Sequence, residues 1–241
     1  MKRLVLFVVG SISLVSFGHQ ARAQRAPADT SASVAAGGLQ RQYNQLVRNA
    51  WSLYNGPEYI DYVRSNTNGH RFFGTKDEQL ATVTYAGTTY ANVLLRYDLI
   101  RGQLVLKPYQ DDFQIQLVNE LVERFSIGGH TFVRLGADAP GRAAFYDVLV
   151  DGPVQALAAH YKKYTEHTTV TTIEGEITAT TTYYLHKDGQ YYPIKKPKDV
   201  VRLFPEHRAA LRSYLQKNNE PEPEQAFIAL VRYQAELAAA H

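Results

Sequence analysis

The chain has 241 residues, of which 26 are basic, 23 are acidic and none is cysteine. Without cysteine the protein has no disulfide, no thiolate nucleophile and no cysteine-ligated metal, so its core alone must hold the fold. Lys2, Arg3 and Arg22 precede residue 24, and without them the basic and acidic residues number 23 each. The remaining chain lacks the basic excess that nucleic-acid binding requires, and we expect no nucleic-acid partner.

The N-terminus has the pattern of an export signal. Lys2 and Arg3 precede the apolar run LVLFVVGSISLVSF, and the small-residue triplet Ala21-Arg22-Ala23 follows it. This order predicts a cleavable signal peptide over residues 1–23 and a mature chain that begins at Gln24. The apolar run is shorter than the roughly 20 residues that span a bilayer, so we expect no transmembrane span after cleavage.

Export also fixes the expected location. No cysteine follows the apolar run, which excludes a cysteine-linked lipoprotein. We therefore expect an exported protein of the periplasm or the extracellular space, including the periphery of the outer membrane.

The segment after the signal differs from the rest in composition. Residues 24–38 are rich in Ala, Ser, Gly and Pro and carry almost no large apolar side chain, which predicts a flexible leader. Residues 39–241 are predicted to form a single β-rich domain. Its first element is a helix, because apolar residues recur at three- and four-residue spacing from Leu39 to Tyr54, before Asn55-Gly56-Pro57 ends the pattern.

From about Leu80 to Ile194 the apolar residues alternate with polar ones, which predicts strands with one buried face. The residues expected on such faces include Ala81, Val83, Tyr85, Val93, Leu95, Tyr97, Leu99, Phe113, Ile115 and Leu117. Short turn signals, among them Ala86-Gly87, Gly128-Gly129 and Asp188-Gly189, separate the runs. Many short strands joined by tight turns indicate an antiparallel meander.

Two regions complete the expected fold. The conformation of residues 153–168 is ambiguous between helix and strand, and we favour strand because VLVDGPVQALAAHY is typical of a hairpin. Residues 197–241 return to helical spacing, with Pro205 expected at the start of one helix. The predicted fold is mainly β with flanking helices (α+β): an antiparallel meander forms a curved sheet or partly closed barrel, with an N-terminal helix and C-terminal helices.

Familiar catalytic and cofactor motifs are missing from the chain. Seven histidines follow residue 23, and none belongs to an HExxH or another zinc-spaced pair. The segment from Ser126 to His130 is not a nucleophile elbow, because Gly128-Gly129 is better interpreted as a turn between strands. No phosphate-binding or dinucleotide-binding glycine pattern is present. We expect no cofactor and no metal site formed by a local motif.

Carboxylate pairs that could support glycoside hydrolysis are Asp111-Asp112, Asp147/Asp151 and Glu174/Glu176. Asp147 is the one candidate with an unusual environment. If Phe145 and Leu149 face the core, Asp147 does so too, and a buried carboxylate needs a partner. Structural pairing with an arginine such as Arg96 or Arg134 is favoured over catalysis.

The stretch YYLHKDGQYYPIKK, residues 183–196, offers two further candidates for ligand binding, Tyr184 and Tyr191. Tyrosine has a flat apolar ring and a polar tip suited to amphipathic ligands. The same residues also fit a hairpin that turns at Asp188-Gly189, with one tyrosine of each neighbouring pair facing the core. Pro193 and the lysines after it favour an edge strand.

One charged region stands out. Between Lys187 and Lys217 the sequence has eight basic and three acidic residues, a net charge of +5. Such a region could bind anionic lipid headgroups or an acidic partner, and it could equally be a solvated helix face.

Several blocks in order carry a resemblance: LYNGPEYIDY, GHRFF, VTYAGTTYANVLLRYDLI, GHTFVRL, FYDVLVDG, YYLHKDGQYYPIKKPKDVVRLF and RAALRSYLQKN. Over about residues 51–233 the chain resembles a family of uncharacterised exported bacterial envelope proteins. The resemblance implies export and one domain, and it implies no activity, cofactor or site residue.

The leading expectation is a non-enzymatic binding or carrier-type protein of the envelope, whose partner is an amphipathic small molecule or a protein. One alternative is a hydrolase acting on envelope or extracellular polymers. The other is a structural or assembly factor of the envelope. A large apolar cavity, acids converging in a polar cleft, or an exposed flat patch would separate the three.

Overall fold

A computed structural model describes residues 53–108, 112–168, 170, 172–218 and 220–239, all within one compact unit, Leu46–His241. Eleven strands are assigned there: β1 (Thr67–Asn68), β2 (Gln79–Tyr85), β3 (Thr88–Asp98), β4 (Gln103–Lys107), β5 (Ile115–Gln116), β6 (Val122–Ile127), β7 (His130–Val133), β8 (Tyr146–Val150), β9 (Gln155–Thr168), β10 (Ile173–Lys187) and β11 (Gln190–Ile194). The helices are a single 3-10 turn η1 (Asn119–Leu121) and the α-helices α2 (Pro197–Leu203), α3 (Arg208–Lys217) and α4 (Pro223–Ala239).

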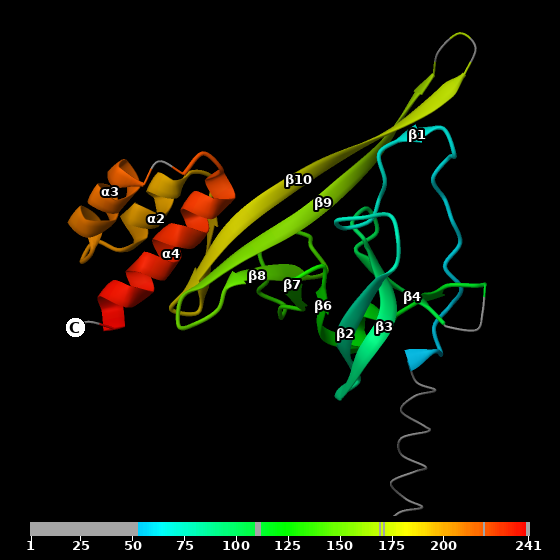
Figure 1. Ribbon diagram of the computed structural model, residues 1–241, viewed down its shortest axis with the longest axis horizontal. Helices are drawn as coiled ribbons and strands as arrows, with labels where there is room; N and C mark the ends of the chain where they lie inside the picture. The colour runs from blue at the N-terminus through cyan, green and yellow to red at the C-terminus, as the bar shows by residue number, and fades with distance from the viewer. Residues whose placement is uncertain (1–52, 109–111, 169, 171, 219, 240–241) are drawn as a thin grey trace, which may run out of the picture. The chain divides into compact units, whose positions relative to one another are not determined.

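The strands form one sheet in the order β1-β10-β9-β8-β7-β6-β2-β3-β4-β5, and β11 pairs with β10 (Figure 1). The predicted antiparallel meander is confirmed for most neighbours, because consecutive strands pair antiparallel from β6 to β11. The sheet is nevertheless mixed, since β1 runs parallel to β10. The sheet does not close into a barrel. Of the two predicted forms, a curved sheet or a partly closed barrel, the structure therefore has an open sheet.

Tight turns set the register of three hairpins. Ala86-Gly87, Gly128-Gly129 and Asp188-Gly189 all have both φ angles between 50° and 82°. Two successive residues with positive φ form the turn whose twist matches that of paired strands. The turns lie where the sequence predicts them, and the structure shows that each joins its strands through only two residues, so that Lys187 pairs directly with Gln190.

The alternating runs bury one face and build the first hydrophobic core. Val93, Leu95, Tyr97 and Leu99 of β3 and its following turn are all buried. The rings of Tyr97, Phe125, Phe132 and Phe145 fill the centre of this core, with centroids 4.8–5.7 Å apart. Phe113 departs from the expected pattern, because it precedes β5 and is 46% exposed. Close-packed aromatic side chains thus fill the space beneath the sheet.

The ambiguous stretch, residues 153–168, is a strand. β9 pairs with β10 from Gln155 to Thr168, so the two make a long hairpin (Figure 1). One face of this hairpin, here called the helix face, includes Ala158, His160 and Tyr183. Ala158 pairs with Tyr183 across the two strands, and His160 is two residues from Ala158, so all three side chains are on the same face. The other, here called the loop face, includes Leu157, Tyr161 and Tyr184.

The C-terminal helices are confirmed, and they build a second core on the helix face. α4 contacts β8 and β9, and α2 contacts β11. Ala156, Leu185 and Ile194 from the strands pack with Val200, Val201, Phe204, Leu211, Phe227, Leu230 and Val231 from the helical region. Pro205 lies between α2 and α3 rather than at the start of a helix. The helices thus cover apolar residues at the β11 side of the sheet.

Several predictions concern the N-terminal region. The signal peptide 1–23, the leader 24–38 and nearly all of the predicted helix from Leu39 to Tyr54 lie outside the described residues. Among the helices that are described, none has the length and apolar character required to cross a bilayer.

Candidate functional site

Asp147 lies between two histidines on the helix face. It is 1% exposed, as the alternation in β8 predicts. Its Oδ2 atom lies 2.6 Å from Nδ1 of His130 and 3.2 Å from Nε2 of His160. The expected arginine partners are wrong: Arg96 hydrogen-bonds to Gln114, and Arg134 donates to the carbonyl of Val122.

Strand register explains why histidines meet Asp147. β8 lies between β7 and β9, and Asp147 pairs with Phe132 on one side and with Ala158 on the other. His130 and His160 stand two residues from these partners, so they share their face. This proximity depends on the order of the strands, which periodicity alone does not give.

The histidine–aspartate cluster, defined as His130, Asp147, His160 and Thr181, forms a chain of hydrogen bonds. Nδ1 of His160 lies 3.1 Å from the Thr181 hydroxyl, which faces it across the β9–β10 pair. A carboxylate oxygen only accepts, so Nδ1 of His130 and Nε2 of His160 are the ring nitrogens that donate to Asp147. The His130 side chain is 40% exposed, which leaves its other ring edge open to solvent.

The chemistry available to this cluster is proton transfer and hydrogen bonding. A carboxylate that fixes the tautomer of an exposed imidazole is the orienting part of an acid–base site. Phe73 borders both histidine rings at 5.0 and 5.2 Å. The 2.6 Å separation is a hydrogen bond, and among the described residues no group of three or more His, Asp or Glu side chains is arranged so that it could hold a metal ion.

Tyr184 is covered on the loop face. It is 9% exposed, and its ring lies 6.2 Å from that of Tyr146 in an edge arrangement. The loop of residues 135–143 packs over both rings and over Tyr161. Burial raises the pKa of the Tyr184 phenol. Tyr184 therefore belongs to a packed cluster rather than to an open surface.

Tyr191 and the remaining tyrosines of the hairpin also have internal partners. The Tyr191 ring stacks on His186 at 4.5 Å, directly across the β10–β11 pair. Tyr183 points to the helix face, where its ring meets Phe227 and its hydroxyl donates to Glu224. The prediction that one tyrosine of a pair faces outward is wrong for Tyr183 and Tyr184, because helix α4 and the 135–143 loop cover both faces.

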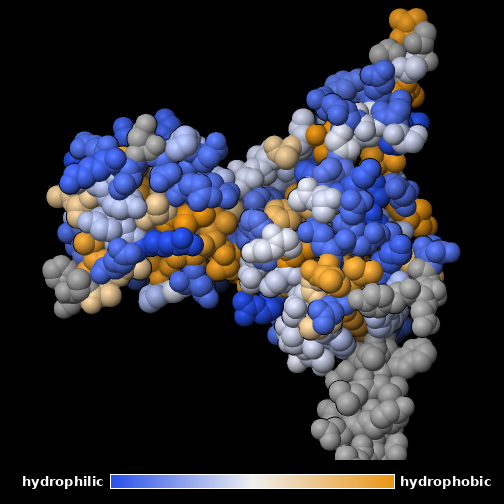
Figure 2. Space-filling model, in the orientation of Figure 1, coloured by the Kyte–Doolittle hydropathy of each residue, from blue (hydrophilic) through white to orange (hydrophobic). Residues whose placement is uncertain are grey.

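The basic region forms a groove between α2 and α3, here called the cationic groove. It has a volume of about 540 Å³. Its lining residues are Lys198, Val201, Arg202, Arg208, Arg212, Leu215 and Gln216. Lys198 and Arg202 lie on α2, and Arg208 and Arg212 lie one helical turn apart on α3. Figure 2 shows hydrophilic residues gathered over these two helices.

All ionisable residues of the cationic groove are positively charged. Among these four basic residues, only Arg202 has an ion pair with a described residue. Its partner is Asp199, at 3.2 Å, and the Arg202 side chain is exposed. Val201 and Leu215 add an apolar floor, which the amphipathic spacing of α2 and α3 places beneath the charges. Four cations around an apolar strip suit an anion that also has an apolar part.

A second groove continues from the first. It has a volume of about 830 Å³ and shares Lys198, Arg202, Leu215 and Gln216 with the cationic groove. Lys195, Lys196 and the proline-rich segment before α4 form its other walls, together with Asp199 and Glu220. The cationic groove thus opens into a larger groove whose basic lining is partly offset by acidic residues.

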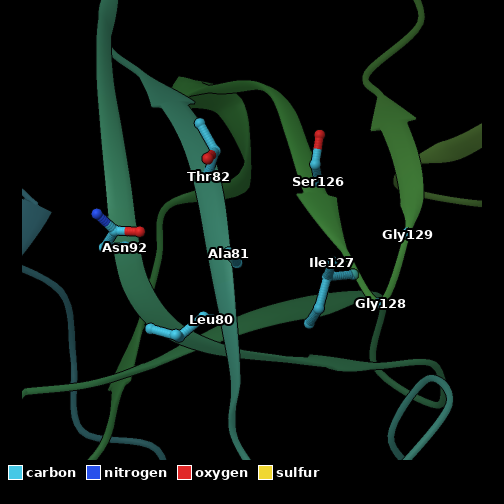
Figure 3. Close-up of a pocket in the computed structure, with 8 residues that line it drawn as sticks. All are labelled: Leu80, Ala81, Thr82, Asn92, Ser126, Ile127, Gly128 and Gly129. Atoms are coloured by element: carbon cyan, nitrogen blue, oxygen red, sulfur yellow. The ribbon is translucent and has the colours of Figure 1, made fainter.

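A third hollow lies on the sheet itself. Figure 3 shows Thr82 of β2 beside Ser126 of β6, Asn92 of β3 on the other side of Thr82, and the Gly128-Gly129 turn close by. Its volume is about 210 Å³, and none of its eight lining residues is ionisable. Gly128 and Gly129 make the expected turn. This hollow offers no group that could carry acid–base chemistry.

The carboxylate pairs do not converge on a cleft. Asp147 is buried, while Asp151 is exposed in the turn after β8 and accepts from Gln155. Glu174 and Glu176 are exposed near the tip of the β9–β10 hairpin. The Asp111-Asp112 pair cannot be placed, because residue 111 lies outside the described residues.

No protein family, curated protein or solved structure compared with this chain matches it. The resemblance to exported envelope proteins therefore stays an expectation.

Proposed function

We propose that this protein is an exported, non-enzymatic binding protein of the cell envelope that holds an anionic amphiphile in the cationic groove. The observation that carries the proposal is that Lys198, Arg202, Arg208 and Arg212 surround the apolar floor of one groove. The phosphate or carboxylate of the ligand faces these cations, and its apolar part lies along Leu215.

Electrostatics favours this ligand class over a neutral one. Each basic residue near an anionic lipid surface contributes about 1 kcal/mol, and arginine also forms paired hydrogen bonds with phosphate oxygens. Exposed charges are screened by salt, so binding should weaken as ionic strength rises.

The place of the groove distinguishes this proposal from a carrier with an internal cavity. Aromatic rings fill the first core, and the second core is closed by α2, α3 and α4. The ligand is therefore held at the surface, with its apolar part only partly covered. Such a protein presents or docks onto an amphiphile rather than enclosing it.

The test is calorimetric titration of the protein with two short-chain lipids below their micellar concentrations, dihexanoyl phosphatidic acid and dihexanoyl phosphatidylcholine. We expect the anionic lipid to bind at least about tenfold more tightly, and Arg212→Glu to weaken that binding by about tenfold or more. The matched control is Arg124→Glu, a charge reversal at an exposed position of β6, which should leave binding unchanged.

Equal affinity for the two lipids, or equal effects of the two charge reversals, would contradict the proposal. Failure of both lipids, with binding of an acidic polypeptide that Arg212→Glu abolishes, would instead support the assembly-factor alternative. Vesicles containing the same head groups separate binding of a single molecule from attachment to a membrane surface.

A further inference from the structure

The strand β10 has an edge that is only partly covered. β9 pairs with one edge of β10 over residues 173–186, so β1 and β11 share the other edge, here called the outer edge. On the outer edge β1 pairs with residues 175–176 and β11 pairs with residues 183–187. Residues 177–182 have no partner strand on this side in the described part of the chain (Figure 1).

The uncovered part is a gap between two strands. β1 is followed by Gly69, and a Cβ at Gly69 would lie 3.3 Å from the carbonyl oxygen of Ile177. At the other end, Ile194 of β11 pairs with Tyr183. The gap therefore extends over the five residues Thr178–Thr182, here called the open edge. At about 3.3 Å per residue it is about 17 Å long.

The backbone groups that face the gap belong to Ala179 and Thr181. Lys162, opposite Ala179 on β9, donates its N–H away from β10, to the carbonyl of Leu99 at 3.1 Å. Opposed residues of an antiparallel pair direct their N–H and C=O groups either toward each other or both away, and successive residues alternate. Ala179 and Thr181 therefore direct two N–H and two C=O groups into the gap, as the carbonyl of Ile177 next to β1 also indicates.

The open edge belongs to a two-stranded part of the sheet. Its partners on β9 are residues 159–163, whereas β8 pairs with β9 only as far as Ala158. The side chains from Thr178 to Thr181 are exposed, so both faces of this part are in contact with solvent. Two strands alone are marginally stable in water, and a third strand stabilises them. An additional strand in the gap would therefore be favoured.

The surroundings of the open edge are basic. Together with its partners, residues 159–163, it contains two lysines and no acidic residue. Lys195 and Lys196 follow β11 at one end of the gap, and their side chains are exposed. Only their backbone N–H groups donate to Asp199. The charge near the gap therefore favours an acidic segment.

The same geometry excludes edge-to-edge pairing with a second copy of this chain. β10 is 15 residues long, and β1 and β11 already cover its outer edge on both sides of the gap. The β10 strand of another molecule would collide with them. A segment of about five residues fits between them.

We propose that the open edge binds an extended acidic segment of a partner protein as an additional strand. The segment runs antiparallel to β10, bonds to the backbone of Ala179 and Thr181, and places its first acidic side chain near Lys195. Main-chain hydrogen bonds supply the affinity, and the lysines supply the preference for acidic sequences. The site is independent of the cationic groove, whose lining contains none of these residues.

The test is residue-resolved amide hydrogen exchange of the mature chain, alone and with the peptide acetyl-Glu-Val-Thr-Val-Glu-amide at millimolar concentration. In the protein alone, the amides of Ala179 and Thr181 should exchange at least about tenfold faster than those of Thr178 and Thr180, which face β9. An excess of peptide should slow exchange at Ala179 and Thr181 by about fivefold or more.

Modified peptides separate backbone pairing from charge. N-methylation of the second and fourth peptide residues removes the donors that face β10, and it should abolish the protection. N-methylation of the third residue, whose N–H faces solvent, is the matched control and should preserve it. The analogue acetyl-Lys-Val-Thr-Val-Lys-amide should bind at least about threefold more weakly than the acidic peptide.

A pair of charge reversals tests the protein side. Lys195→Glu should weaken binding of the acidic peptide by about threefold or more. Lys217→Glu, at an exposed position at the end of α3, should leave it unchanged. Slow exchange of Ala179 and Thr181 in the protein alone would show that the edge is already covered, by the chain itself or by a second copy, and would overturn the proposal. Unchanged exchange with the peptide, or equal effects of the two N-methylated peptides, would do the same.

Discussion

At the scale of single residues, Asp147 shows how a polar group is accommodated inside this sheet. Its carboxylate is almost inaccessible, yet both of its described partners are imidazoles and one of these is 40% exposed. If the histidines were removed, the buried carboxylate would lose its hydrogen-bond donors. If the carboxylate were removed, the imidazole N–H groups would lose their acceptor, and either loss is destabilising. The cluster therefore contributes to stability whether or not it handles protons.

We expect Asp147→Ala to lower the free energy of unfolding by about 2–4 kcal/mol, because both imidazoles lose their acceptor and a small cavity remains. Urea unfolding followed by circular dichroism measures the change. Asp138→Ala, at an exposed position in the 135–143 loop, is the control and should change stability by less than about 0.5 kcal/mol. Equal effects of the two substitutions would show that the Asp147 hydrogen bonds do not matter.

At the scale of elements, two glycines illustrate different demands of the sheet. Gly189 has φ 74°, and a Cβ there would meet no atom within 4 Å. Gly175, where β1 joins β10, lacks a positive φ, but a Cβ there would lie 2.3 Å from Thr67 Oγ1 and 2.6 Å from Tyr164. Gly189 is needed because its backbone has a positive φ, and Gly175 is needed because a side chain there would clash with β1.

The same substitution should therefore have different effects at the two sites. Gly189→Ala is expected to destabilise the protein by about 1–2 kcal/mol through the left-handed backbone alone. Gly175→Ala is expected to displace β1, and amide exchange should then accelerate around Thr67 and Asn68 while the β10–β11 turn stays protected. If exchange near β1 is unaffected by Gly175→Ala, the close approach of the two strands is not needed.

The sequence pattern locates the turns, strands and C-terminal helices of this protein, but it does not show which strands pair with one another. The turns at Ala86, Gly128 and Asp188 follow from local backbone preferences, so they can be located without a structure. The C-terminal helices follow from apolar spacing. The parallel pairing of β1 with β10 joins Thr67 to Gly175, and no local pattern contains such information.

The candidate sites show the same limit. The charge run between Lys187 and Lys217 can be read from the sequence, but only helix packing shows that Lys198, Arg202 and Arg212 line one groove. The aromatic stretch suggested Tyr184 and Tyr191, whose rings are instead taken up by internal contacts. Asp147 was identified from alternation, while its partners required the strand order.

At the scale of the whole molecule, buried phenols should make the fold sensitive to alkali. Burial is the largest cause that raises the pKa of six tyrosines above the ordinary value of 10.0, and for Tyr146 the pKa rises to about 12. The others are Tyr59, Tyr62, Tyr97, Tyr183 and Tyr184. The unfolded chain releases these protons at lower pH than the folded chain does.

A raised folded-state pKa contributes stability that is complete below the unfolded value and disappears as pH rises through the folded value. We therefore expect the free energy of unfolding to be insensitive to these groups below about pH 9 and to fall steadily above about pH 10. Phenolate absorbance should rise in two steps, the second together with the loss of far-ultraviolet circular dichroism. A single normal titration of all tyrosines in a folded chain would contradict this expectation.

The two hydrophobic cores draw on consecutive parts of the chain. The buried residues of the first come from Leu53 to Phe145, and those of the second from Ala156 to Val231. A growing polypeptide therefore contains every buried side chain of the first core before any of the second has been synthesised. Two strand pairs connect the two cores: β9 pairs with β8, and β10 pairs with β1. In both pairs, the later strand is synthesised after the residues of the first core. The order of the residues thus allows assembly to proceed from the N-terminal side, in step with translation.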